Sequence, residues 1–263
     1  MTNISDKCVL CEYFCQAHVA EAGKYSRASK GCMLGKRRRA KCEKWPADIA
    51  CCYQWLAKQD PNSDESAKKY AQELLNRWAE LDEIKHIERK EGYKRSSHDG
   101  KPTSPNTGDE KCEKEVAKDL FRLCNGEQER LFLPLGKFID YETPLGTSRN
   151  NTYGDIDLLA YNEETSTYTI VELKRKDNKE SLLRAVVEAF TYSKRVWFDK
   201  LVEDFGLSAK GPIQKAVLVF KGEKQHDQYK NQPTVRALME KLGVELFVIS
   251  KAGKDDYRIE GAE

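Results

Sequence analysis

The sequence lacks any apolar run that approaches the ~18 residues needed to cross a membrane. Its first residues, MTNISDKCVLCEYF, lack the basic start and the long apolar core of a secretory signal. We therefore expect no membrane association and a reducing compartment, the cytoplasm. In that compartment the nine cysteines are suited to metal binding or to free thiols rather than to disulfides.

Motifs of several common enzyme classes are missing as well. The four histidines are scattered, without an H-E-x-x-H motif or a convincing hydrolase triad. The segment 31–36 is one residue short of a phosphate-binding loop and continues with Arg37 instead of Ser or Thr. What is present is a polar globular composition, 39% hydrophobic and 33% charged. With 263 residues, the chain allows one large domain or two small ones.

Cysteine is concentrated near the N-terminus, where seven of the nine lie between Cys8 and Cys52. The C-x2-C pair of Cys8 and Cys11 is typical of the first half of a zinc site. Cys32 and Cys42 are the candidates for the second half, although they are farther apart than usual. The sequence thus predicts a structural Zn²⁺ site here and leaves an iron–sulfur cluster or buried thiols open.

Positive charge is concentrated in the same region, although the whole chain has a net charge of only +2. Between Lys24 and Lys44 there are nine Lys or Arg residues and a single acidic residue. Such a stretch favours a polyanionic partner, and the alternative is a solvated basic loop. We predict that it contacts a nucleic-acid backbone, without reading bases, through Arg37, Arg38, Arg39 and Lys41.

Composition and periodicity predict two domains and a linker. Residues 1–92 would form a cysteine-rich, basic, mainly helical N-terminal domain, with a helix over 64–90. Residues 93–109, rich in Gly, Pro and Ser, would form the linker. Residues 110–263 would form a mixed α/β domain. Its predicted elements are a helix over 110–124, strands over 131–143, 153–161 and 167–175, a helix over 179–203, a strand over 215–220, a helix over 233–242 and a strand over 244–250.

Two of these predicted strands carry charged residues within apolar sequence, GDIDLLAYN and TYTIVELKR. Side chains alternate between the faces of a strand, so Glu172 and Lys174 share one face. The short connection predicts an antiparallel hairpin in which the numbers of paired residues add up to 329. Asp157 then lies opposite Glu172, and Asp155 lies opposite Lys174.

Carboxylates gathered this closely repel one another unless a cation lies between them. A hard divalent cation, Mg²⁺ or Mn²⁺, suits oxygen ligands of this kind. A lysine beside the metal can orient or deprotonate a water molecule and stabilise developing charge. This combination indicates phosphodiester hydrolysis. The alternative is an exposed hairpin whose acidic and basic residues form cross-strand pairs.

The pattern G-D-I-D-L-L-A followed by I-V-E-L-K-R resembles the PD-(D/E)XK nuclease superfamily, which has the restriction-endonuclease-like fold. It is closest to the branch whose strands read G-x-I-D-L-L and V-I-E-L-K. The resemblance covers about residues 110–250 and implies an αβββαβ core with a mixed central sheet. It also implies that Asp157, Glu172 and the Leu173 carbonyl bind the metal and that Lys174 is the catalytic lysine.

Members of this family often place a further glutamate on the helix before the sheet. Helical periodicity puts Glu113 about 20° from Leu120, on the inward face, and Glu115 about 140° away. Glu113 is therefore the candidate for an additional catalytic and metal-binding residue. The alternative is a solvated helix glutamate.

Many members of the branch also carry Q-x-x-x-Y on the helix after the lysine strand. Here Glu188 and Tyr192 have that spacing, with Arg184 on the same helix face. The carboxylate of Glu188 would repel phosphate unless it pairs with Arg184 or approaches a metal. Arg184 and Tyr192 are the candidate nucleic-acid contacts, and the alternative is a surface Arg–Glu pair.

The sequence favours a Mg²⁺-dependent nuclease, with DNA preferred over RNA as the substrate and with endo- or exonuclease action left open. One alternative is a non-catalytic nucleic-acid-binding protein on a nuclease-like scaffold, against which the intact set of Asp157, Glu172 and Lys174 argues. Another is a cysteine-rich interaction module whose α/β domain is only structural. No oligomeric state is predicted.

Overall fold

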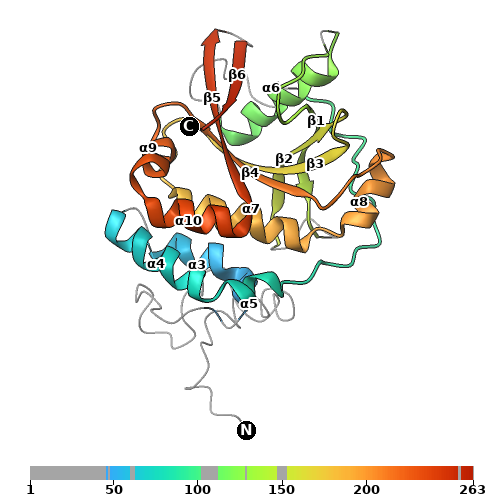
Figure 1. The fold of residues 1–263 in the computed structure, drawn as a ribbon. Coiled ribbons are helices and arrows are strands. Elements are labelled where there is room, and N and C mark those ends of the chain that lie inside the picture. Colours follow the sequence, from blue (N-terminus) through green and yellow to red (C-terminus); the bar gives the residue numbers. More distant parts are fainter. Residues whose placement is uncertain are drawn as a thin grey trace, which may run out of the picture.

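The computed structural model describes residues 46, 48–59, 63–101, 112–127, 129–146, 153–253 and 256–262. These residues form an α/β fold around one mixed sheet of six strands (Figure 1). No helix in this part of the chain is long and apolar enough to span a membrane. The predicted zinc ligands and the four basic residues predicted to bind a nucleic-acid backbone lie outside the described residues.

The strands follow one another across the sheet in chain order. β1, β2 and β3 are antiparallel, β3, β4 and β5 are parallel, and β6 is antiparallel to β5. Parallel neighbours require long crossover connections, which is where the helices between β3 and β5 lie. The strands are β1 (Lys137–Pro144), β2 (Asp155–Asn162), β3 (Thr167–Lys174), β4 (Gln214–Phe220), β5 (Val244–Gly253) and β6 (Asp256–Gly261).

Local sequence signals explain several helix ends. The Ser63 and Ser181 hydroxyls accept backbone N–H groups at the starts of α4 and α7. Gly206 and Gly243 end α8 and α10 in the left-handed conformation. The helices are η3 (Ile49–Cys51), α3 (Cys52–Gln59), α4 (Asp64–Asn76), α5 (Trp78–Asp82), α6 (Glu113–Asn125), α7 (Leu182–Arg195), α8 (Phe198–Phe205), α9 (Lys224–Asn231) and α10 (Pro233–Leu242).

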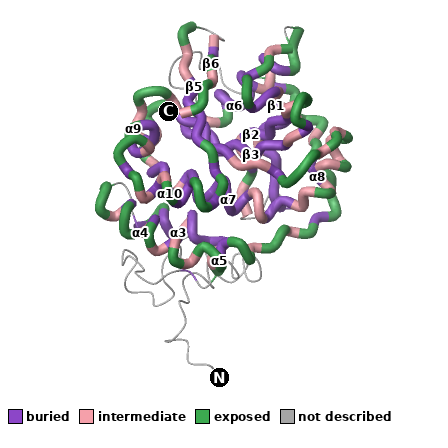
Figure 2. The backbone as a smooth tube through the Cα atoms, in the orientation of Figure 1, coloured by how far each residue is buried: buried purple, intermediate pink, exposed green. Residues whose placement is uncertain are grey.

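Helices cover both faces of the sheet, so the sheet is buried on both sides (Figure 2). α6 packs on one face together with Val171 and Leu173. α7 and α10 cover the other face, which carries Ile170 and Val217. Because neighbouring residues of β3 enter opposite cores, the strand is buried almost throughout, including its charged residues Glu172 and Lys174.

The first described helices extend the core on the α7 side. Tyr53 and Leu56 of α3 and Leu74 of α4 belong to the same cluster of buried residues as Val186 of α7 and Leu238 of α10. α4 lies against α10, and α3 lies against α7 (Figure 1). Among the described residues, the predicted boundary after residue 92 therefore does not separate two hydrophobic cores.

The described part of the predicted linker, residues 93–101, is packed against the protein. Tyr93 is fully buried; its backbone N–H donates to Asp204 and its hydroxyl accepts from the Trp197 N–H. Just before it, the Arg89 guanidinium donates to the Pro144 carbonyl. Gly, Pro and Ser in this stretch correctly predicted irregular backbone, but irregular backbone can still be held by buried side chains.

Several predicted element bounds are wrong. The helix predicted over 64–90 is interrupted at Arg77 and ends at Asp82, and the helix predicted over 179–203 is interrupted at 196–197. Val196 takes an extended conformation there, although the apolar pattern continues into α8. The first strand starts at Lys137, six residues later than predicted, because residues 132–136 form a turn closed by a bridge between Phe132 and Gly136. α9 and β6 were not predicted.

We expect Leu74→Ala to destabilise the sheet as well as α4, because Leu74 is fully buried in the core that α4 shares with α7 and α10. The cost should be about 2–5 kcal/mol of unfolding free energy. Lys68→Ala, on the exposed side of the same helix, is the matched control. Hydrogen exchange of the β3 and β4 amides measures the effect, and unchanged protection in Leu74→Ala would show that α4 is energetically separate from the sheet.

Candidate active site

The β2–β3 hairpin has the predicted register. Leu158 pairs with Val171 and Leu159 with Ile170, so the residue numbers of each pair add up to 329. Backbone pairing ends at Leu158 and Val171, and the next donor, the Leu173 N–H, bonds to Asp157 Oδ2 at 2.8 Å. The two strands therefore separate at this end, and the side chain of Asp157 lies in the space between them.

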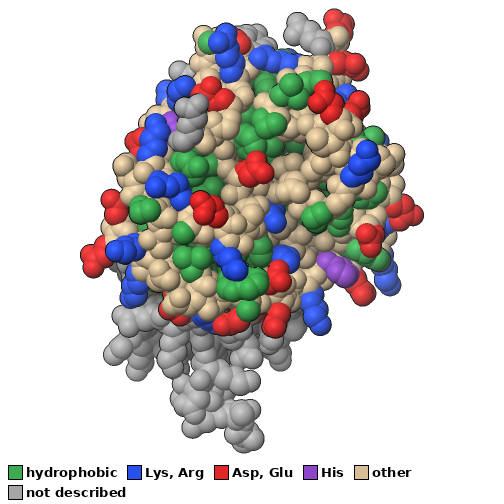
Figure 3. All heavy atoms as spheres, in the orientation of Figure 1, with side chains coloured by type: hydrophobic (Ala, Val, Ile, Leu, Met, Phe, Trp, Pro, Cys, Tyr) green, Lys and Arg blue, Asp and Glu red, His purple; other side chains and the backbone are tan. Residues whose placement is uncertain are grey.

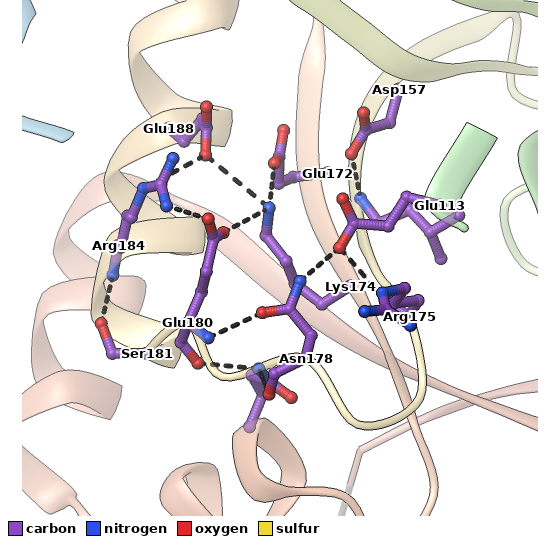
Figure 4. A network of polar contacts seen from close by, with 12 residues as sticks. Glu113, Asp157, Glu172, Lys174, Arg175, Asn178, Glu180, Ser181, Arg184 and Glu188 are labelled. Carbon is purple, nitrogen blue, oxygen red and sulfur yellow. Dashed lines mark hydrogen bonds and ion pairs between the residues drawn. The ribbon is translucent and has the colours of Figure 1, made fainter. Parts of the chain in front are cut away.

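The ammonium group of Lys174 is the centre of the polar cluster at this end of β3 (Figure 4). Its Nζ lies 2.6 Å from Glu172 Oε1, 3.0 Å from Glu180 Oε2 and 3.7 Å from Glu188 Oε2. The side chains of Lys174 and Glu172 are each only 4% exposed. Burial by itself lowers the pKa of Lys174, but the surrounding carboxylates outweigh it and raise the pKa, so Lys174 stays protonated.

The two predicted metal-binding carboxylates share an environment that disfavours negative charge. Burial raises the pKa of Asp157 to about 7, although Lys174 and the Leu173 N–H act against this. Burial, together with the charges of Asp157 and Glu188, raises the pKa of Glu172 well above its usual value. Asp157 is only half-buried, so the cluster is open to solvent on its side. A cation placed there would relieve the repulsion.

Glu113 takes the predicted inward position at the first turn of α6. Its Oε1 accepts the Arg175 N–H at 3.3 Å and also the side-chain amide of Asn178. Figure 4 shows it beside Asp157, and its charge adds to the burial that raises the pKa of Asp157. Glu113 is only partly buried, whereas Glu115, which was predicted to lie away from the inward face, is buried and pairs with Lys118 at 3.3 Å instead of joining this cluster.

The predicted face of α7 is formed as expected, with Glu188 between its two partners. Tyr192 donates a hydrogen bond of 2.9 Å to Glu188 Oε1, and Arg184 Nε lies 3.9 Å from Glu188 Oε2. Glu188 thus pairs with Arg184, as expected from the sequence if its carboxylate is not to repel phosphate, and it also pairs with Lys174. Tyr192 is only 4% exposed, so its contacts lie inside the protein, away from the surface that a nucleic acid would reach. Arg184 remains partly exposed.

Gly154, at the start of the G-D-I-D motif, is required by the packing of α7 against β2. It has a φ of +87°, and a Cβ atom there would lie 2.2 Å from the Tyr192 hydroxyl. Only glycine both adopts this conformation readily and leaves room for the tyrosine. The motif glycine and the helix tyrosine, 38 positions apart in the chain, therefore act as one unit.

Three residues of the cluster were not found from the sequence. Asn178 and Glu180 lie in the connection between β3 and α7, where Glu180 was wrongly predicted to be helical, and Gln225 lies in the unpredicted α9. Asn178 Oδ1 accepts the Glu180 N–H at 2.6 Å, and the buried Gln225 amide donates to the Asn178 and Glu180 carbonyls. The one available signal was Ser181, whose hydroxyl accepts the Arg184 N–H and marks the true start of α7.

The chemistry of these donors fits a hard divalent cation. Among the described residues, no three His, Cys, Asp or Glu side chains are already gathered as a metal site. Mg²⁺, however, needs only one or two carboxylates, and Asp157 and Glu172 supply two. The N–H and C=O of one strand residue point to the same side. Because the Leu173 N–H reaches Asp157, the Leu173 carbonyl also points toward that carboxylate.

Comparison with known proteins finds no counterpart for this arrangement: no family model, no curated protein and no solved structure matches the chain. The resemblance to the PD-(D/E)XK nucleases thus stays a prediction that rests on the motifs and on the geometry described above.

We expect the metal-free protein to lose stability as the pH rises from 5 to 8. The raised pKa of Asp157, about 7 against an ordinary 3.8, means that the folded protein holds a proton which the unfolded chain has already released. The stabilisation is complete below pH 4 and is lost through pH 7; it is at most about 4 kcal/mol, and partial solvation reduces it.

Thermal melting of wild type and Asp157→Asn across this range measures the effect. The melting temperature of Asp157→Asn should depend less on pH than that of wild type and should be the higher of the two at pH 8. The lowered pKa of His226 acts in the opposite direction, so the difference between the two proteins is the decisive quantity. Asp177→Asn, at an exposed loop position, is the control. Parallel pH curves for wild type and Asp157→Asn would contradict the prediction.

We expect Gly154→Ala to displace the Tyr192 hydroxyl from Glu188. The matched control is Gly206→Ala, since Gly206 also has a positive φ, of +67°, but has open space where a Cβ would lie. In the control, backbone strain should lower the unfolding free energy by only ~1 kcal/mol, and Gly154→Ala should lower the unfolding free energy clearly more. Adding Tyr192→Phe should recover part of the excess loss of unfolding free energy. Equal losses in the two alanine variants would mean that the close contact is unimportant.

Proposed function

We propose that the protein is a divalent-metal-dependent nuclease that hydrolyses phosphodiester bonds, with DNA as the first substrate to test. One observation carries the proposal: Asp157, Glu172 and Lys174 converge where β2 and β3 separate. Buried carboxylates with raised pKa values beside a protonated lysine are typical of a functional site. The repulsion between these carboxylates weakens the fold, so it is not explained by a structural role.

In this proposal, Asp157, Glu172 and the Leu173 carbonyl would hold Mg²⁺ or Mn²⁺, and Glu113 would contribute negative charge beside them. When bound, such an ion polarises a phosphoryl oxygen and makes a bound water molecule more acidic. In the metal-free protein the surrounding carboxylates raise the pKa of Lys174 against the effect of burial, and the protonated lysine is suited to donate hydrogen bonds to an anionic oxygen.

The described part of the protein offers limited electrostatic attraction for a polyanion. On the face shown in Figure 3, acidic and basic side chains are interspersed. Arg184 and Arg175 are partly exposed cations beside the cluster of carboxylates. The basic stretch of residues 24–44 remains the proposed backbone-binding segment, which would contact phosphates irrespective of sequence.

The decisive experiment is cleavage of labelled single- and double-stranded DNA and RNA with Mg²⁺, with Mn²⁺ or with EDTA. Asp157→Asn and Glu172→Gln should abolish metal-dependent cleavage, and Lys174→Met should reduce it at least about a hundredfold. Asp155→Asn, two residues along the same strand, and Lys176→Met, two residues after the lysine, are controls of matched chemistry and should remain active. Circular dichroism confirms that each variant is folded.

Metal binding is measured separately by melting at pH 8. Mg²⁺ or Mn²⁺ should stabilise wild type, because a ligand that binds only the folded state raises its stability, and should stabilise Asp157→Asn much less. Wild type that binds these ions and nucleic acid but cleaves none of the four substrates would favour a non-catalytic nucleic-acid-binding protein. Cleavage that survives all three substitutions would place the active site elsewhere.

A further inference from the structure

The carboxylate of Glu180 bridges the two cations that border the proposed active site (Figure 4). Its Oε2 lies 3.0 Å from Lys174 Nζ, and its Oε1 pairs with a guanidinium nitrogen of Arg184. Lys174 comes from β3 and Arg184 from the first turn of α7, so these cations lie on either side of the connection that carries Glu180. An anionic group with two oxygens fits between them.

The backbone of Glu180 is held firmly, whereas its carboxylate is at the rim. The Glu180 N–H donates to Asn178, and the Glu180 carbonyl accepts from the fully buried Gln225 at 2.7 Å. The Glu180 side chain is 30% exposed, compared with 4% for Glu172 and 9% for Glu188. Of the three carboxylates around Lys174, Glu180 is therefore the one that can leave by rotating its side chain toward solvent.

Hydrogen bonding around these cations is incomplete. Among the described atoms, Glu180 Oε2, Glu188 Oε2 and Arg184 Nε are buried and make no hydrogen bond, although each lies within ion-pair distance of an opposite charge. Charge attraction without good hydrogen-bond geometry holds the group more weakly than a complete network would. A ligand with more acceptor oxygens than a carboxylate would satisfy the donors better.

We propose that Glu180 occupies the position of a substrate phosphate and competes with it for Lys174 and Arg184. Arg and Lys bind phosphate and carboxylate oxygens by the same charge-assisted hydrogen bonds, so either anion satisfies both cations. Exchange of one anion for the other leaves neither cation unpaired and breaks no covalent bond. The inference rests on the proposed function, and it makes Glu180 a positioning residue that lowers affinity for phosphate groups until it swings out.

The first test measures the binding of inorganic phosphate to the metal-free protein by its effect on the melting temperature. Glu180→Gln removes the competing charge at nearly constant shape and should tighten phosphate binding about tenfold, the size expected for one charge-assisted hydrogen bond. Asp177→Asn removes the same charge from an exposed position of the same connection and should change binding less than about twofold. Arg184→Gln should remove most of the gain when it is combined with Glu180→Gln.

The second test separates competition from simple support of Lys174. If cleavage is observed, Glu180→Gln should lower KM and leave kcat within about threefold of wild type. A fall in kcat with unchanged KM would overturn the inference, as would equal gains in phosphate binding by Glu180→Gln and Asp177→Asn. The same measurements on Glu180→Ala are the control for new hydrogen bonds from the glutamine amide of Glu180→Gln to Lys174 or Arg184.

The two proposals can fail independently. Tighter phosphate binding by Glu180→Gln without cleavage of any nucleic acid would retain the phosphate site and reject the nuclease. Metal-dependent cleavage together with unchanged phosphate binding in Glu180→Gln would retain the nuclease and reject the competition.

Discussion

The buried ammonium group of Lys174 is the interaction on which the arrangement of the site depends. A charge that is 4% exposed must be paired, because removing it from water unpaired would cost several kcal/mol. Its partners come from β3, from the connection after β3 and from α7. Pairing with all three fixes how the connection turns and where the first half of α7 lies relative to the sheet.

The same cluster carries more negative charge than its cations neutralise. Glu113, Asp157, Glu172, Glu180 and Glu188 surround Lys174 and Arg184. Burial, and to a smaller extent the neighbouring carboxylates, raises the pKa values of Asp157 and Glu172. This repulsion weakens the fold at neutral pH, and the two hydrophobic cores on either side of the sheet offset it. Such a local cost within an otherwise consistent structure is expected where a protein binds a ligand.

The described N-terminal helices are connected to this cluster by direct contacts. The Tyr53 ring of α3 packs edge-on against the Tyr192 ring of α7 at 5.6 Å between centroids. Tyr192 bonds to Glu188, and Glu188 lies beside Lys174. The helices before residue 93 therefore support α7, which carries Arg184 and Glu188, and this part of the chain does not divide at the predicted linker.

Much of the site followed from local sequence pattern. Strand alternation and a short hairpin connection are enough to place Asp157 opposite Glu172, because a two-residue period and a tight turn leave one simple register. Helical periodicity likewise placed Glu113 inward and put Arg184, Glu188 and Tyr192 on one face. These predictions depend only on contacts within an element or between adjacent strands. The structure confirms the register of the paired residues and the shared face of Glu188 and Tyr192. The pairing of β2 with β3 ends before Asp157, however, and Asp155 is exposed and pairs with Pro144 of β1 instead of lying opposite Lys174 as predicted.

The sequence alone determined the order of the first five strands along the chain, the hairpin register and the two carboxylates and lysine at its end. Only the tertiary structure decided that Glu180 bridges Lys174 and Arg184, that Gln225 holds the connection, and that Gly154 makes room for Tyr192. It also decided that α7 stops at Arg195 while the apolar pattern continues. The physical reason is that each of these features depends on how irregular backbone or distant elements pack in space, and neither propensity nor periodicity encodes such contacts.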